Sequence, residues 1–131
     1  MLMFAESPGA GGGRVQQVLV VEDQFIVAKS LVQLLEDYGV KVIGPAQSVK
    51  KAMALLDSVT CDAAVLDINL GNETVEPVAE RLEQSGMPYF FVSGYASPKL
   101  MNPKFKSRTL LHKPVDPAMF RQKIAEALSR A

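Results

Sequence analysis

The sequence has 131 residues, a length that favours one domain with a hydrophobic core of its own. Lys and Arg together number 14, as do Asp and Glu, so the basic excess of a nucleic-acid-binding protein is missing. No apolar run is long enough to cross a bilayer, no secretory signal begins the chain, and the single Cys61 can form neither an internal disulfide nor a zinc site. We therefore expect a cytoplasmic protein that neither binds nucleic acid nor inserts into a membrane.

The N-terminal stretch MLMFAESPGAGGGR, residues 1–14, is Gly-rich and aperiodic, which predicts a flexible tail ahead of a folded domain over residues 15–131. Val18–Val21 is a short apolar run, typical of a strand in a parallel sheet that helices cover on both faces. Phe25–Tyr38 then repeats apolar residues at helical spacing and stops at Gly39, which predicts a helix with a glycine C-cap.

Short apolar runs continue to alternate with helical patterns along the rest of the chain. Four further strands are predicted, at Val40–Ile43, Ala63–Ile68, Tyr89–Val92 and Thr109–His112. The first of these is expected to end at Gly44-Pro45. Three further helices are predicted, one after the N-cap Ser48, one at Val75–Gln84 and one opened by Asp116-Pro117. The segment ASPKLMNPKFKSR before the last strand contains two prolines, so we expect a short or irregular turn of helix there.

The alternation of strands and helices predicts an α/β fold with a parallel sheet and right-handed crossovers. For five strands the expected arrangement is flavodoxin-like, a (βα)5 three-layer sandwich around a sheet of order 2-1-3-4-5. Ligands bind such sheets outside the carboxyl ends of the strands, where the strand order reverses. Here the reversal separates the first strand from the third.

Acidic residues stand at the ends of the two strands that flank this point. Glu22 and Asp23 come directly after the first strand, and Asp67 lies near the end of the third. Carboxylates packed together repel one another, so protonation or a cation must relieve their charge. Because the cluster offers oxygen ligands and neither His nor Cys, Mg²⁺ is the cation that suits it.

Two more strand ends face the same cleft. Ser93 and Gly94 follow the fourth strand in FFVSGY, and Lys113 follows the fifth in LLHKP. A divalent cation, an ammonium group, a hydroxyl and backbone N–H groups around one aspartate would complement a phosphoryl group. Asp67 is then the expected nucleophile, and its product is an acyl phosphate.

The motifs at the strand ends, taken together, resemble those of the receiver domain of two-component response regulators: Glu22-Asp23, Asp67, Ser93 and Lys113-Pro114. The resemblance covers the chain after residue 14. It implies that Asp67 accepts a phosphoryl group from a sensor histidine kinase or a phosphotransfer protein. It further implies that Ser93 and Lys113 bind phosphoryl oxygens and that the Lys113–Pro114 bond is cis.

The same resemblance implies a ligand set for Mg²⁺. The ion would be held by Asp23, Asp67 and the main-chain carbonyl of Asn69, with Glu22 acting mainly through a water. These assignments are expectations that follow from the family.

The sequence also departs from most receivers. They carry an aromatic residue three positions before the lysine, where this chain has Leu110. FFVSGY instead resembles the FATGY segment of a subfamily of mostly single-domain receivers without the aromatic switch, and DINLGNET resembles the same subfamily. We hypothesise that Tyr95 and the segment Ala96–Arg108 carry the switch by changing order on phosphorylation, with Gly94, Leu110 and Pro114 flanking the phosphoryl path.

The expected function is that of a single-domain response regulator, which binds a downstream protein or drains phosphate from a relay. The last helix ends at the C-terminus, so no output domain is expected, and the only catalysis expected is self-directed phosphotransfer and autodephosphorylation. A degenerate receiver that acts as a phosphorylation-independent scaffold is one alternative. A phosphatase with an aspartyl nucleophile is another, disfavoured because Asn69 replaces the second acid of its Asp-x-Asp motif. A flavodoxin is discarded because Glu22-Asp23-Gln24 stands where its phosphate loop would be.

Overall fold

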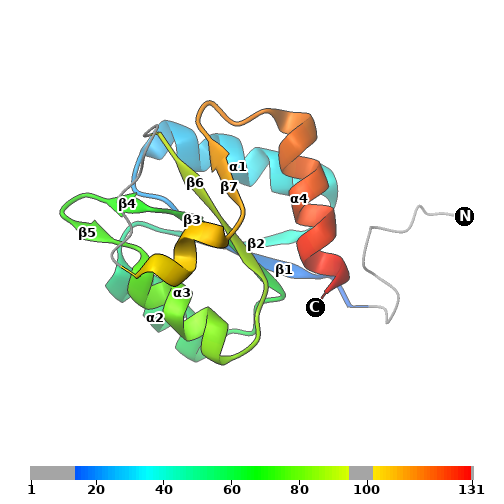
Figure 1. Ribbon diagram of the computed structural model, residues 1–131. Helices are drawn as coiled ribbons and strands as arrows, with labels where there is room; N and C mark the ends of the chain where they lie inside the picture. Colours follow the sequence, from blue (N-terminus) through cyan, green and yellow to red (C-terminus); the bar gives the residue numbers. More distant parts are fainter. Residues whose placement is uncertain (1–13, 95–101, 131) are drawn as a thin grey trace, which may run out of the picture.

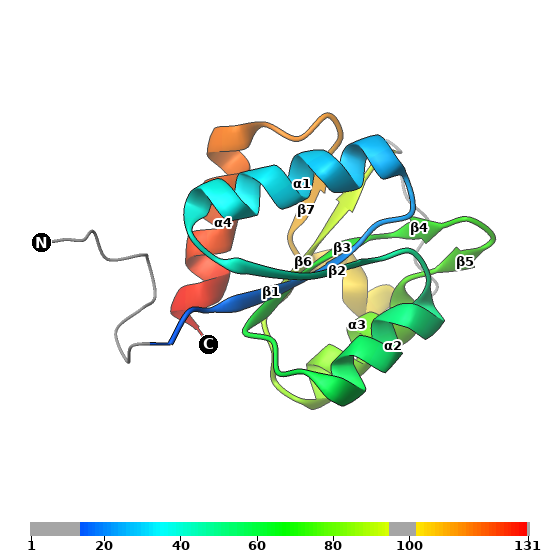
Figure 2. The ribbon, with the colours of Figure 1, turned by 180° about the vertical axis from the view of Figure 1, so that it is seen from behind.

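In the computed structural model, which describes residues 14–94 and 102–130, the chain forms a three-layer α/β sandwich (Figure 1). Five parallel strands make the middle layer in the order β2-β1-β3-β6-β7. Helices α1 and α4 cover one face of this sheet, and α2 and α3 cover the other (Figures 1 and 2). The predicted flavodoxin-like fold and its strand order are confirmed.

The strands of the main sheet are β1 (Gln17–Val21), β2 (Lys41–Ala46), β3 (Ala63–Asp67), β6 (Tyr89–Ser93) and β7 (Leu110–His112). The helices are α1 (Phe25–Tyr38), α2 (Val49–Ser58), α3 (Glu76–Gln84) and α4 (Pro117–Ser129). The other described elements are the short antiparallel strands β4 (Asn69–Leu70) and β5 (Glu73–Thr74) and the 3-10 turn η1 (Pro103–Ser107).

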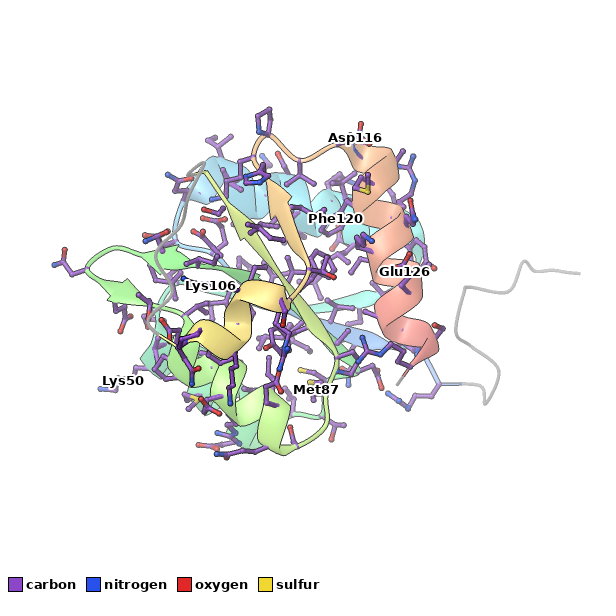
Figure 3. All side chains as sticks on the ribbon, viewed as in Figure 1. Lys50, Met87, Lys106, Asp116, Phe120 and Glu126 are labelled. Carbon is purple, nitrogen blue, oxygen red and sulfur yellow. The ribbon has the colours of Figure 1, made fainter. Side chains whose placement is uncertain are left out.

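The central strands are uniformly apolar because both faces of the sheet are buried. Successive residues of β1 point to opposite faces, so Leu19 joins the core beneath α2 and α3 while Val20 joins the core beneath α1 and α4. On the second face Phe120 of α4 packs edge-to-face on Phe90, with ring centroids 5.8 Å apart. Figure 3 shows Phe120 between α4 and the sheet, whereas Glu126 of the same helix points outward.

Three helix termini follow from local chemistry, as predicted. Helix α1 ends at Gly39, whose φ of 103° lies in the left-handed region that glycine adopts without a Cβ clash. Helix α2 starts after Ser48, whose side chain accepts a hydrogen bond from Lys51 N–H at 3.1 Å. Helix α4 starts after Asp116, whose carboxylate accepts from Met119 N–H at 2.9 Å.

The predicted end of the second strand is wrong, because β2 continues through Gly44-Pro45 to Ala46. Proline is tolerated there since β2 is an edge strand, and the pairing of β1 with β2 shifts register at this point. Gly44 has a φ of 99°, and a Cβ on it would lie 2.7 Å from the Ala46 nitrogen, so the irregular strand depends on glycine. The other predicted ends differ from the observed ones by about one residue, as helix and strand ends commonly do.

The hairpin of β4 and β5 was not predicted, because two-residue strands are too short to show an alternating pattern. The hairpin projects beyond the carboxyl end of β3 (Figure 1). Glu73 of β5 reaches the start of α2, where its Oε2 accepts a hydrogen bond from Val49 N–H at 3.1 Å. The segment that follows Asp67 is thereby attached to a neighbouring helix.

Between β6 and β7 the described residues form only the 3-10 turn η1, in line with the predicted short or irregular helix. Its Phe105 is buried and packs edge-to-face on Phe91, with ring centroids 6.0 Å apart. Arg108 follows η1 and donates from Nε to Glu83 Oε2 of α3 at 2.7 Å. These contacts hold the second half of the connection against β6 and α3.

Some predictions concern residues outside the described ranges. Residues 1–13 of the predicted tail are among these, and so are Tyr95 and residues 96–101 of the expected switch segment. In the ranges 14–94 and 102–130, no helix is both long and apolar enough to cross a membrane.

Candidate functional site

The carboxyl ends of four strands bring the predicted site residues to one edge of the sheet. Glu22 directly follows β1, Asp67 ends β3, Ser93 ends β6 and Lys113 directly follows β7. Because the strands are parallel, all these ends lie on the same side of the molecule. The cleft at this edge has a volume of about 350 Å³ and is lined by Asp23, Gln24, Asp67, Asn69, Gly71, Gly94 and Lys113.

The predicted acidic cluster is present. Glu22, Asp23 and Asp67 each place a carboxylate oxygen within 4.8 Å of the others. Glu22 and Asp67 are buried, whereas Asp23 is more open to solvent. Asn69 adds a buried side-chain Oδ1 that has no hydrogen-bond partner among the described residues. An all-oxygen set of this kind, with an unsatisfied oxygen beside it, fits a hard divalent cation such as Mg²⁺.

Lys113 supplies the positive charge of the cleft. Its Nζ lies 2.9 Å from Glu22 Oε1 and 3.4 Å from Asp67 Oδ2, and it donates a hydrogen bond to Gln24 Oε1 at 3.3 Å. Its backbone N–H donates to the Ser93 carbonyl at 2.8 Å, which joins the ends of β7 and β6. The Lys113–Pro114 bond is cis, as the resemblance implied. The ammonium group thus links three strand ends.

The electrostatics centre on Asp67. Its burial and the neighbouring Glu22 carboxyl raise the pKa of Asp67 to about 7, while Lys113 and the Asn69 backbone N–H act in the opposite direction. Without a cation the Asp67 carboxyl therefore holds a proton readily near neutral pH. A bound divalent cation would favour the carboxylate instead, because it stabilises the charged form.

The remaining predicted residues lie at or near the cleft. Ser93 is fully buried at the end of β6, and Gly94 is exposed at the rim, where a Cβ would lie 3.8 Å from Lys113 Cδ. Leu110 is half-buried and packs against the core beneath α2 and α3. Tyr95 lies outside the described residues.

Two residues that line the cleft were not predicted as site residues from the sequence. Gly71 takes a φ of 60° in the turn of the β4–β5 hairpin and lines the cleft. Gln24 follows the acid pair in the chain, and this adjacency was the one available signal for it. Nothing in the sequence pairs Gln24 with Lys113, because that contact joins residues 89 positions apart.

A second cleft, of about 300 Å³, lies at the opposite ends of the strands, where β6 and β7 begin. Glu83, Tyr89 and Arg108 form a hydrogen-bonded group there, and the Arg108 guanidinium with the Tyr89 hydroxyl lowers the pKa of Glu83 to about 2. These polar groups satisfy one another, and the cleft contains no predicted site residue.

Comparisons with known proteins agree with the geometry. The family model for the response regulator receiver domain matches residues 18–125. The phyllosphere-induced regulator PhyR of Methylorubrum extorquens is 28% identical over 115 residues, which are 86% of this chain and 43% of that protein. The regulatory protein VirG of Agrobacterium fabrum is 32% identical over 93 residues, which are 70% of this chain and 36% of that protein. The chain thus spans less than half the length of these relatives.

Solved structures also resemble this chain, and one of them is a receiver domain. A CheY-like receiver domain protein from Methanospirillum hungatei superposes with a TM-score of 0.77 and 28% identity, covering 88% of this chain and 95% of that one. SdrG from Sphingomonas melonis is 32% identical, with a TM-score of 0.73 and coverage of 88% and 95%. PhyR from Brucella abortus has a TM-score of 0.73 at 23% identity, covering 88% of this chain and 49% of that one, a likeness of fold alone.

Proposed function

The chain belongs to the response regulator receiver family, a family of signalling modules, and from this premise we propose that it accepts a phosphoryl group on Asp67 in a Mg²⁺-dependent reaction. The donor is a sensor histidine kinase or a phosphotransfer protein. The observation that carries the proposal is the meeting of Glu22, Asp23 and Asp67 with the Lys113 ammonium in one cleft. We further propose that phosphorylation controls binding to a downstream protein, or that the chain drains phosphate from a relay.

In the proposed reaction an Asp67 carboxylate oxygen attacks the phosphorus atom of a phosphohistidine. The new O–P bond forms as the P–N bond breaks, and the imidazole nitrogen leaves with the electron pair and takes a proton from solvent. The Lys113 ammonium and the Ser93 hydroxyl then stabilise the phosphoryl oxygens by charge and hydrogen bonding. Autodephosphorylation reverses the state when water attacks the same phosphorus atom: the O–P bond to Asp67 breaks, the carboxylate leaves with the electron pair, and inorganic phosphate and a proton are released.

The acids of the cleft would hold Mg²⁺ through Asp23, Asp67 and the main-chain carbonyl of Asn69, with Glu22 acting through a water. When bound, the ion would supply charge that offsets the phosphoryl oxygens. The residues present suit this role because they offer oxygen donors and a net negative charge around Asp67.

The switch is proposed to lie beside the phosphoryl path. Leu110 cannot act as the aromatic reporter of other receivers, so we assign the response to Tyr95 and the segment 96–108, with Gly94, which lines the cleft, and Pro114, which follows Lys113, beside the phosphoryl path. The relatives named as regulators, PhyR and VirG, support a regulatory output. We place this activity in the cytoplasm, where the buried free Cys61 would stay reduced.

The test is the intact mass of the protein after incubation with Mg²⁺ and acetyl phosphate, beside an Asp67→Asn variant. We expect one added phosphoryl group in the wild type, lost in the variant and lost when Mg²⁺ is chelated. If neither protein gains mass, and a panel of phosphorylated kinases also transfers nothing, the scaffold alternative is favoured. Steady turnover of an added phosphoester would instead favour the phosphatase alternative.

A further inference from the structure

Gln24 reaches across the cleft from the start of α1 to the end of β7. Its side-chain Oε1 accepts a hydrogen bond from Lys113 Nζ at 3.3 Å. Its backbone N–H donates to Glu22 Oε2 at 3.1 Å, and its carbonyl accepts from Ala28 N–H at 2.9 Å. The backbone of Gln24 is therefore held on both sides, which restricts where its side chain can go.

This position departs from the usual chemistry of a helix start. Gln24 is the N-cap residue of α1, a position where Ser, Thr, Asp and Asn are preferred because a short side chain accepts a hydrogen bond from the first turn. Ser48 and Asp116 do this for α2 and α4. Gln24 makes no side-chain cap hydrogen bond within the described part of the chain. Val75, the N-cap residue of α3, makes none either, but it has no polar side chain, whereas the Gln24 amide remains available for a contact across the cleft.

The chemistry of the two side chains determines how they meet. An ammonium group can only donate, so the amide oxygen of Gln24 faces Lys113 and the amide nitrogen points elsewhere. The ammonium donates a hydrogen bond to Gln24, while its contacts with Glu22 Oε1 at 2.9 Å and Asp67 Oδ2 at 3.4 Å are ion pairs. Glu22 Oε1 has no hydrogen-bond partner among the described residues. Glu22 is the closer of the two carboxyls, so it attracts the Lys113 ammonium more strongly than Asp67 does. Gln24 competes for the ammonium without adding negative charge to the cleft.

We propose that Gln24 is a positioning residue, which keeps the Lys113 ammonium within reach of the Asp67 carboxyl instead of paired with Glu22 alone. The inference rests on the proposed phosphoacceptor function, and it makes Gln24 act through Lys113. Phosphoryl transfer depends steeply on the placement of the groups that stabilise it. Removing the acceptor oxygen is therefore expected to slow phosphorylation of Asp67 by about tenfold.

Two variants separate positioning from a structural role. Gln24→Met keeps the length of the side chain and removes the acceptor, while Gln24→Asn keeps the amide, shortens its reach and restores a favourable N-cap. With acetyl phosphate and Mg²⁺, time courses of intact mass should show both variants phosphorylated about tenfold more slowly than wild type. Gln24→Asn should nevertheless unfold at the same or a higher temperature. Wild-type rates in both variants would overturn the proposal.

A double variant tests whether Gln24 acts through Lys113. In a Lys113→Ala background, Gln24→Met should cause no further slowing, because the group it positions is gone. An undiminished tenfold effect in that background would contradict the inference by showing that Gln24 acts independently.

A spectroscopic measurement distinguishes failure of this inference from failure of the proposed function. In protein labelled with ¹³C-lysine, the Lys113 side-chain resonances should move in Gln24→Met, while those of the exposed Lys50 stay in place. If the wild type accepts no phosphoryl group, the proposed function fails, yet a shift at Lys113 still supports the positioning contact. Unchanged Lys113 resonances would overturn that contact whether or not the protein is phosphorylated.

Discussion

Two buried carboxyls, Glu22 and Asp67, share the ammonium group of Lys113 as their one close cation among the described residues. Taking charged groups out of water is costly, and the attraction between the carboxylates and the ammonium group often does no more than offset this cost. A cluster with an excess of acid over base is therefore expected to weaken the fold when no cation is bound. Such an arrangement is typical of a reactive site, where the reactivity of a carboxyl group is retained at a cost in folding stability.

Replacing Asp67 with Asn should make the metal-free protein more resistant to heat at pH 8. The pKa of Asp67 is raised to about 7 from its ordinary value of 3.8, so the folded protein disfavours the carboxylate at any pH above that ordinary value. The penalty is full above about pH 7 and disappears as the pH falls through the ordinary value, where both states hold the proton. Circular dichroism melts in EDTA would measure the gain.

The more exposed Asp23 offers the matched control for this prediction. Asp23→Asn should raise the melting temperature at pH 8 by less than Asp67→Asn does, because its carboxylate is better solvated. A lower melting temperature for Asp67→Asn at pH 8 would show that its carboxylate stabilises the fold.

At the scale of elements, α3 holds the connection that leads into β7. Glu76 accepts a hydrogen bond from Asn102 N–H at 3.0 Å, Glu80 pairs with Lys104, and Glu83 pairs with Arg108. The three acids recur at helical spacing, so they lie along the side of α3 beside η1 (Figure 1). The second half of the proposed switch segment is thus attached by surface ion pairs together with the buried Phe105.

Glu83→Gln should destabilise the protein at pH 7 by about 0.2–1 kcal/mol, the range of a solvent-exposed ion pair. The Arg108 guanidinium and the Tyr89 hydroxyl lower the pKa of Glu83 to about 2. The stabilisation is complete above the ordinary pKa of 4.5 and is lost as the pH falls toward 2, so the cost of the variant should shrink in acid. Urea unfolding at pH 7 and pH 3 measures both values.

Glu126→Gln is a suitable comparison for this variant, since Glu126 forms an exposed pair with Lys123 within α4. Its effect should stay within a few tenths of a kcal/mol at either pH. An equal or larger cost for Glu83→Gln at pH 3 than at pH 7 would mean that its charge is not what holds Arg108.

At the scale of the whole molecule, the site exists because a parallel sheet gathers the ends of distant strands. Asp23 and Asp67 come from strands that are neighbours in the sheet, and Lys113 comes from its far edge. A cation bound by the first two residues would link segments far apart in the chain. Binding of this kind stabilises the folded state alone, because the unfolded chain does not bring the ligands together.

Mg²⁺ should therefore raise the melting temperature, and by more at pH 8 than at pH 6. At a free concentration ten times the dissociation constant the expected stabilisation is about 1.4 kcal/mol. Below the Asp67 pKa of about 7, the ion must displace a proton, so its affinity falls by up to about tenfold per pH unit. Melts with and without MgCl₂ at both pH values measure the effect.

Asp23→Asn removes one proposed ligand and should abolish most of this shift, while monovalent salt at equal ionic strength reports on general screening. If the shift is the same at pH 6 and pH 8, proton displacement from Asp67 does not accompany binding. If NaCl reproduces it, the acids do not form a specific cation site.

Much of the fold could be predicted because it rests on short-range patterns. The helix Phe25–Tyr38, its Gly39 cap and the capping side chains of Ser48 and Asp116 depend on residues within a turn of one another. The β4–β5 hairpin and the continuation of β2 through Gly44-Pro45 were missed. Both depend on how a segment meets its neighbours, which local propensity does not report.

The sequence by itself determined which residues end the strands, and so which carboxyls, hydroxyl and ammonium group could share one edge of the sheet. Only the tertiary structure decided how they meet: that Lys113 divides its contacts among Glu22, Asp67 and Gln24, and that burial raises the pKa of Asp67 to about 7. The physical reason is that distance and desolvation determine electrostatic energies. Both quantities arise from the packing of segments that are remote in the chain.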